Sequence, residues 1–346
     1  MPVHPLLTKA RLMGNPIIEG EKATFIWQGR TAPHLVDDLH NWEDDPQTLQ
    51  RIGPGLWSYS MRLANDTYLE YGFLDPKSGE RIADPLNQKR ILNGIHSSNH
   101  YFYMPRGGPS PLTQAAPGVP RGTITRFQVP TKEYVAGSKR TVILYQPAVK
   151  DPVPLMVVYD GTEYLRRAKL NIIADNLIAQ KRVRPFAMAL IKNGGQARNL
   201  EYSCSESTLA FVVDCIIPLA KENLRLISPG RGEYGVAGAS LGGLMALYSG
   251  IRLPKLFGKV ISQSGAFTFS EHESLVADLV RHLPPQKIDI WMNAGVYEWL
   301  LETNRQMYAL LKEKNYKVKY YEFSGGHNYT SWRNEIWRGM EALFRS

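Results

Sequence analysis

The sequence has little cysteine and no long apolar run, and these two absences exclude several classes of protein. Cys204 and Cys215 are the only cysteines among 346 residues. Their spacing matches no metal-ligand motif, so we predict two reduced thiols, no disulfide framework and no metal site. No apolar run approaches the ~20 residues that span a bilayer, and residues 1–20 lack the apolar stretch of a signal peptide. We therefore expect a cytoplasmic protein without a membrane partner.

The sequence also lacks blocks of like charge and any basic–aromatic recognition motif, which argues against a nucleic-acid partner. Its charge is nevertheless uneven. Residues 1–120 carry 11 basic and 12 acidic side chains, and residues 121–346 carry 30 and 20, so the net charge of +9 belongs to the second part. This excess favours an anionic small-molecule ligand; ordinary solvated surface charge is the alternative.

Short, regularly spaced apolar runs separated by turn clusters occupy residues 23–83, which contain no clear helix pattern. The predicted strands are Ala23–Trp27, Leu56–Met61 and Tyr68–Phe73. This pattern predicts a small β-sandwich domain over residues 1–104. Residues 105–122 are rich in proline and glycine and are predicted to be a linker, followed by a second domain over residues 123–346.

Strand and helix patterns alternate in the second domain, which predicts a doubly wound, mostly parallel α/β sheet. The predicted strands are Thr123–Val129, Thr141–Tyr145, Leu155–Tyr159, Phe186–Ile191, Tyr234–Ala237, Lys259–Ser262, Ile288–Asn293 and Lys317–Phe323. The predicted helices are Leu165–Ala179, Thr208–Leu226, Leu241–Ile251, Leu275–His282, Trp299–Lys314 and Ser331–Phe344.

Ser240 lies at the centre of a Gly-x-Ser-x-Gly pattern, residues 238–242, directly after the fifth predicted strand of this domain. The pattern is typical of the nucleophile elbow of α/β-hydrolases. The turn from strand to helix is so sharp that the residues two before and two after the serine must be small. We therefore predict that Ser240 is a catalytic nucleophile.

A serine nucleophile requires a general base, and an acid that orients this base. His327 follows the last predicted strand and two glycines, so we predict that it is the base. Glu298 lies just beyond the strand that ends near Asn293, and we predict that it is the acid. A helix N-terminal role for Glu298, an acid role for Glu302 and a Ser–His dyad are alternatives.

The oxyanion that forms during ester cleavage requires two backbone N–H donors. Leu241 directly follows the nucleophile and is predicted to supply one of them. The second is expected from the loop after the third strand, where we predict the Thr162 N–H, with Gly161 as the alternative. Asp160 in the same loop is expected to hold the shape of the loop. This chemistry requires no metal or organic cofactor.

The sequence resembles the enterochelin esterase family over most of its length. The segments that carry the resemblance are Trp27, Asn41-Trp42, Leu56-Trp57 and Asp84–Asn87 in the first part, and Asp160-Gly161, Arg198 with Glu201, the Ser240 elbow, residues 262–265, residues 325–327 and Trp332-Arg333 in the second. The resemblance implies an early-set immunoglobulin-like sandwich followed by an α/β-hydrolase domain. It also implies hydrolysis of the trilactone of ferric catecholate siderophores in the cytoplasm.

The same resemblance implies substrate-binding roles for Arg198, Arg333 and Trp332. For Arg198 the alternative is a structural ion pair with Glu201, and for Trp332 it is a place in the core. The sequence departs from the family at Asn328, where an acidic residue often follows the histidine.

Two other functions remain open. One is a feruloyl or acetyl carbohydrate esterase with a glycan-binding sandwich, and the other is a binding protein with an inactive hydrolase domain. Sequence patterns do not predict the oligomeric state.

Overall fold

The computed structural model describes residues 3–92, 98–230, 232–269 and 272–345. The chain forms two compact units. The first comprises residues 1–109 together with Gly295–Trp299 and Ser324–Ser331, and the second comprises the rest of the chain. Two short segments from late in the sequence therefore belong to the N-terminal unit.

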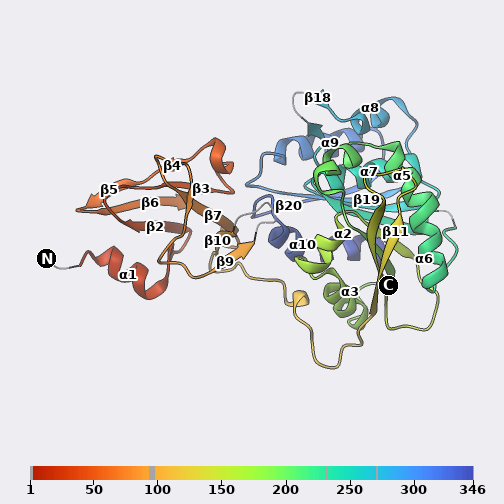
Figure 1. The fold of residues 1–346 in the computed structure, drawn as a ribbon, viewed down its shortest axis with the longest axis horizontal. Coiled ribbons are helices and arrows are strands. Elements are labelled where there is room, and N and C mark those ends of the chain that lie inside the picture. The colour runs from red at the N-terminus through yellow and green to blue at the C-terminus, as the bar shows by residue number, and fades with distance from the viewer. Residues whose placement is uncertain (1–2, 93–97, 231, 270–271, 346) are drawn as a thin grey trace. The chain divides into compact units, whose positions relative to one another are not determined.

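The first unit is an antiparallel β-sandwich, as the sequence predicts (Figure 1). One sheet has the order β1-β2-β6-β5 and the other has the order β4-β3-β7-β10-β9, with β8 paired to β7. The strands are β1 (Ile17–Glu19), β2 (Lys22–Gln28), β3 (His34–Asp37), β4 (Gln47–Thr48), β5 (Gln50–Gly53), β6 (Leu56–Arg62), β7 (Tyr68–Leu74), β8 (Arg81–Ile82), β9 (Arg90–Leu92) and β10 (Ser98–Tyr103). Phe25, Tyr71 and Phe102 pack edge to face in its core.

The second unit contains one eight-stranded sheet with the order β11-β12-β14-β13-β15-β16-β19-β20. The strands are β11 (Thr123–Pro130), β12 (Lys139–Gln146), β13 (Leu155–Val158), β14 (Ala187–Ile191), β15 (Tyr234–Ala239), β16 (Phe257–Gln263), β19 (Asp289–Gly295) and β20 (Lys317–Phe323). The neighbouring strands from β14 to β19 in this order are parallel, whereas β12 is antiparallel to both of its neighbours, β11 and β14. The inner strands β13, β14 and β15 were predictable because they are buried, continuous apolar runs. The edge strands β11 and β20 are partly exposed and alternate apolar with polar residues.

Helices pack against this sheet, and two small strands form a separate ribbon (Figure 1). The helices of this unit are α2 (Gly161–Arg166), α3 (Leu170–Ala179), α4 (Arg198–Tyr202), α5 (Glu206–Phe211), α6 (Ile217–Asn223), α7 (Leu241–Arg252), α8 (Leu275–His282), α9 (Leu301–Glu313) and α10 (Tyr329–Phe344). The ribbon pairs β17 (Thr268–Phe269) with β18 (His272–Glu273). The first turn of α10 belongs to the first compact unit.

The structure differs from the sequence prediction at three helices. The patterns do not predict α1 (Pro5–Met13), which buries only Leu7 and Ala10. The predicted helix 165–179 is two helices, because Lys169 adopts a left-handed conformation with φ of 53°. The predicted helix 208–226 is interrupted by a π-helical segment at residues 212–216, and Pro218 follows in the first turn of α6.

Among the described residues, no single helix combines the length needed to cross a membrane with the necessary apolar composition. The helices at residues 195–202 and 206–223 meet both criteria only when taken together, and a bend of 103° separates them.

Candidate active site

Ser240 lies in the turn between β15 and α7. Every residue of β15 is buried, and α7 begins at the next residue, Leu241. Ser240 has φ of 58° and ψ of −127°, in the left-handed half of backbone space that a non-glycine residue adopts only under strain. The Gln263 carbonyl accepts a hydrogen bond from the Ser240 N–H at 2.9 Å, which fixes the turn against β16.

The two glycines of the pattern have different roles in this turn. A Cβ atom at Gly238 would lie 2.2 Å from the carbonyl oxygen of Gly242, so only glycine fits there. A Cβ atom at Gly242 would lie 3.1 Å from Asp160 Oδ2, which is a milder overlap. The close approach of the two backbones therefore requires glycine strictly at the first position.

Glu298 and His327 lie side by side in the first compact unit. Glu298 follows β19, His327 follows β20, and these strands are neighbours in the sheet order. His327 Nδ1 lies 3.3 Å from Glu298 Oε2. The Glu298 side chain is fully buried, and that of His327 is 11% exposed. The carboxylate is thus placed to orient the imidazole and to stabilise its cationic form.

Glu302, the alternative acid, is in a different environment. Its side chain is 66% exposed and lies 3.8 Å from Arg305 on the surface of α9. Trp299 packs on the His327 ring with the ring centroids 4.5 Å apart, although it is 54% exposed. In the sequence, Trp299 lies only at the start of a predicted helix, and no pattern indicates its contact with His327.

Ser240 belongs to the second unit, whereas Glu298 and His327 belong to the first. The pairing of Ser240 with His327 therefore stays a prediction.

The loop after β13 is held by a network of buried polar groups. Asp160 has φ of 52°, and α2 begins at Gly161, where a Cβ atom would lie 2.3 Å from the backbone of Leu190. Tyr202 accepts a hydrogen bond from the Asp160 N–H. Burial, and secondarily the Asp160 charge, raise the pKa of Tyr202 well above its usual value, so its hydroxyl stays protonated. Thr162 follows as the second residue of α2.

Arg198 forms an ion pair, but its partner is Asp160 and not Glu201. The Asp160 oxygens accept hydrogen bonds from Arg198 Nε at 2.9 Å and from Nη2 at 2.7 Å. Glu201 instead accepts two hydrogen bonds from the guanidinium of Arg140, at 2.6 and 2.8 Å, in a pair that is 5% exposed on each side. The alternative to substrate binding for Arg198, a structural ion pair with Glu201, was therefore wrong in its partner. Arg198 pairs with Asp160, and Glu201 pairs with Arg140 on β12.

Trp332 is a core residue. It is 4% exposed, and its indole N–H donates to Ser264 Oγ at 2.8 Å. Arg333 is half-buried, and its Nε lies 3.4 Å from Asn334 Oδ1.

A cavity of about 270 Å³ adjoins Thr162, and its wall carries three cationic side chains. These are Arg126 on β11, Arg166 at the end of α2 and Lys192 directly after β14, with Glu163 as the one acidic neighbour. These three residues could not be predicted from the sequence, because they are far apart in the chain and none lies in a recognisable motif.

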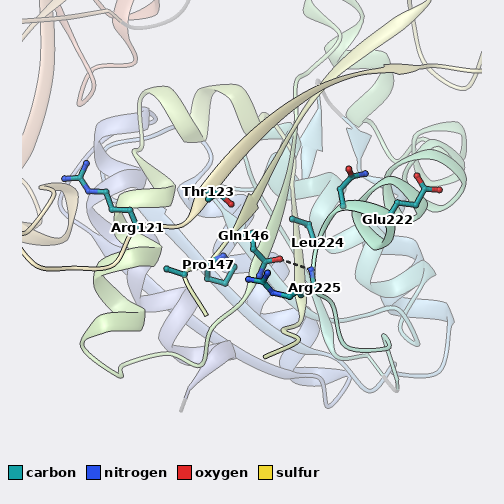
Figure 2. Close-up of a pocket in the computed structure, with 9 residues that line it drawn as sticks. Arg121, Thr123, Gln146, Pro147, Glu222, Leu224 and Arg225 are labelled. Atoms are coloured by element: carbon teal, nitrogen blue, oxygen red, sulfur yellow. Dashed lines mark hydrogen bonds between the residues drawn. The ribbon is translucent and has the colours of Figure 1, made fainter. Parts of the chain in front are cut away.

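The residues drawn in Figure 2 line a larger cavity, of about 470 Å³. Gln146 ends β12, which runs antiparallel to β14, so the cavity lies near the amino ends of the parallel strands. Arg121 and Arg225 also line it (Figure 2). In open α/β sheets, ligands bind at the carboxyl ends of the strands, so this cavity is not the candidate active site. The described residues contain no cluster of histidine, cysteine and carboxylate side chains suited to a metal ion.

Comparison with known proteins identifies relatives of both units. The protein family described as "Putative esterase" matches residues 134–343. The iron(III) enterobactin esterase of Escherichia coli K12 is 24% identical over 344 residues, which cover 88% of this chain and 84% of that protein. The solved ferric enterobactin esterase of Salmonella typhimurium superposes with a TM-score of 0.77 at 23% identity and covers 93% of both chains. The Shigella flexneri enterobactin esterase, solved in the presence of enterobactin, superposes with a TM-score of 0.74 at 21% identity and covers 93% of this chain and 92% of its own.

Proposed function

The chain belongs to the esterase family that matches residues 134–343, and on that basis we propose that it is a serine esterase. Its proposed reaction opens the ester bonds of an enterobactin-type iron(III) siderophore in the cytoplasm. The likeness to an iron(III) enterobactin esterase over 88% of the chain supports this substrate class, because it includes the sandwich as well as the hydrolase unit. Iron enters as part of the substrate.

Ser240 attacks the ester carbonyl while His327 takes its proton. His327 then returns the proton to the leaving alcohol, and water hydrolyses the acyl-enzyme by the same steps in reverse order. Glu298 accepts the Nδ1–H of His327, which leaves Nε2 as the basic nitrogen. The observation that carries this assignment is the 3.3 Å approach of Glu298 Oε2 to His327 Nδ1.

Backbone N–H groups stabilise the tetrahedral oxyanion. Leu241 supplies one from the first turn of α7, and Thr162 supplies the other from α2, with Gly161 as the alternative. The ion pair of Asp160 with Arg198 helps to hold this loop in place. Removal of one such donor typically lowers kcat by about 10²–10³.

The cationic wall beside Thr162 suits an anionic catecholate. Arg126, Arg166 and Lys192 place positive charge around a cavity that adjoins the proposed oxyanion donor. Such a surface raises the local concentration of an anionic substrate. The Arg198 guanidinium is 24% exposed, and the Asp160 carboxylate already neutralises its charge. We therefore propose that Arg198 stabilises the loop after β13 rather than binding the substrate. Arg333 remains a second candidate contact.

Turnover of ferric enterobactin and of methyl ferulate by the same enzyme preparation tests the proposal. We expect ferric enterobactin to be cleaved with a kcat/KM at least tenfold higher, and Ser240→Ala to abolish turnover. Preference for methyl ferulate would support a carbohydrate esterase instead. Failure of a fluorophosphonate to label Ser240 would support a binding protein with an inactive site.

A further inference from the structure

Asp38 is a buried carboxyl of the sandwich that reaches the segment carrying His327. It directly follows β3, is 4% exposed and lies in the first compact unit with residues 324–331. Its Oδ2 accepts two hydrogen bonds, one from the Glu70 backbone N–H at 2.9 Å and one from the Asn328 side chain at 3.1 Å. Asp38 therefore connects strand β7, which contains Glu70, with Asn328, the residue directly after the proposed base His327.

Asp38 also contacts the residue that precedes His327. A Cβ atom at Gly326 would lie 2.2 Å from Asp38 Cγ and 2.4 Å from its Cβ, so the loop closes on Asp38 only with glycine there. On the other side, Asn328 Oδ1 accepts the Ser331 N–H at 2.9 Å, which fixes the start of α10. His327 is therefore held between two residues that both lie against Asp38.

The segment carrying Glu298 is attached to the same part of the sandwich. Tyr297 donates its backbone N–H to the Gly325 carbonyl at 3.2 Å, and its hydroxyl lies 3.2 Å from Thr67 Oγ1. The Tyr68 N–H donates to the Ser324 carbonyl at 3.1 Å. Strand β7 and the turn before it thus hold the two segments that bring acid and base together.

The Asp38 carboxyl depends on its hydrogen bonds because it is buried away from water. Burial and the Glu70 charge raise the pKa of Asp38 well above its usual value. Desolvation of such a group is unfavourable unless its hydrogen bonds offset it. Asn328 donates one of these hydrogen bonds, and an apolar side chain at position 38 could not accept it.

We propose that Asp38 is a positioning residue for the His327 base, acting through Asn328 and Gly326, so that the sandwich is part of the catalytic machinery. This inference rests on the proposed function of His327. The Asp38 carboxyl does not contact the reacting atoms. It keeps the imidazole beside Glu298, which orients the ring to take the proton of Ser240.

The test compares kcat, KM and the rate of fluorophosphonate labelling in full-length variants. Asp38→Ala and Asn328→Ala are each expected to lower kcat on the order of tenfold to a hundredfold, with KM unchanged within about twofold, because a displaced base affects the chemical step. Asp38→Asn should restore most of kcat, since its amide oxygen accepts the same two hydrogen bonds. The double variant of Asp38→Ala with Asn328→Ala should be no slower than the slower single variant.

Asp84→Ala is the matched control. Asp84 is another buried carboxyl of the sandwich, 2% exposed, and it accepts hydrogen bonds from Asn15, Tyr71 and Leu86. We expect it to lower the melting temperature while kcat stays unchanged. An equal fall of kcat in Asp84→Ala would show a general stability effect and overturn the inference.

Three further outcomes decide the matter. Full kcat in Asn328→Ala overturns the inference even if Asp38→Ala does not fold. Additive losses in the double variant also overturn it. Activity retained by Ser240→Ala would instead refute the proposed function, whereas an inactive Ser240→Ala with a fully active Asn328→Ala refutes the positioning role alone.

Discussion

Glu298→Gln is the perturbation that most directly tests the acid–base pair. The amide keeps the shape of the buried side chain but removes the charge that stabilises the imidazolium in the transition state. It also presents either an oxygen without charge or an N–H to His327 Nδ1, and the second choice favours the wrong tautomer. The change therefore acts on kcat, with little effect on substrate binding.

The expected magnitude follows from the geometry. Unit charges separated by the observed 3.3 Å interact by about 5 kcal/mol at an effective dielectric constant of ~20. Solvent screens this pair little, because the side chains of Glu298 and His327 are 0% and 11% exposed. At 1.36 kcal/mol per factor of ten, the loss corresponds to a fall in kcat of roughly 10³–10⁴.

The assay is the steady-state hydrolysis of a p-nitrophenyl ester at neutral pH, with Glu302→Gln as the matched control. Glu302 is one turn further along the chain and exposed, so its variant should retain wild-type kcat. A Glu298→Gln enzyme with kcat within about threefold of wild type would refute the reasoning and favour a Ser–His dyad. Loss of activity in Glu302→Gln alone would move the acid to that residue.

Three other predictions concern the scaffold. Gly238→Ala should prevent soluble expression or abolish activity, because its Cβ would lie 2.2 Å from a backbone oxygen, whereas Gly242→Ala should remain soluble and folded by circular dichroism. Arg140→Met should lower the free energy of urea unfolding by about 3–5 kcal/mol, because it leaves the buried carboxylate of Glu201 without its cation; a loss below about 1 kcal/mol would contradict this. Burial raises the pKa of the Cys204 thiol to about 11, so the thiolate forms only as the pH approaches that value. Alkylation of Cys204 by iodoacetamide at pH 7.5 should therefore be on the order of 100-fold slower than that of an exposed cysteine, and it should accelerate up to about pH 11. Fast labelling of Cys204 at pH 7.5 would contradict this prediction.

The sheet of the second unit and the place of Ser240 could be predicted from sequence because both depend on local patterns. Buried strands are short apolar runs, and the elbow requires glycine at a fixed distance from the serine. The pairing of Glu298 with His327 was predictable because each follows a predicted strand, in the chain order serine, acid, histidine. The structure adds that the two strands are neighbours.

Contacts between segments far apart in the chain could not be predicted in this way. Arg140 and Glu201 are 61 residues apart, and no pattern in either segment indicates the other. The same holds for Asp38 and Asn328, which are 290 residues apart. Such partners depend on how strands pack, and a single sequence contains no local signal for that packing.

The composition of the first compact unit has a consequence for the order of folding during synthesis. A ribosome releases residues 1–109 long before residues 295–299 and 324–331, which complete that unit. At about 5–20 residues per second, the interval amounts to roughly ten to forty seconds. During this interval the nascent sandwich lacks the hydrogen bond of Asp38 to Asn328. Residues 1–109 therefore reach their final structure only after the late segments have been synthesised.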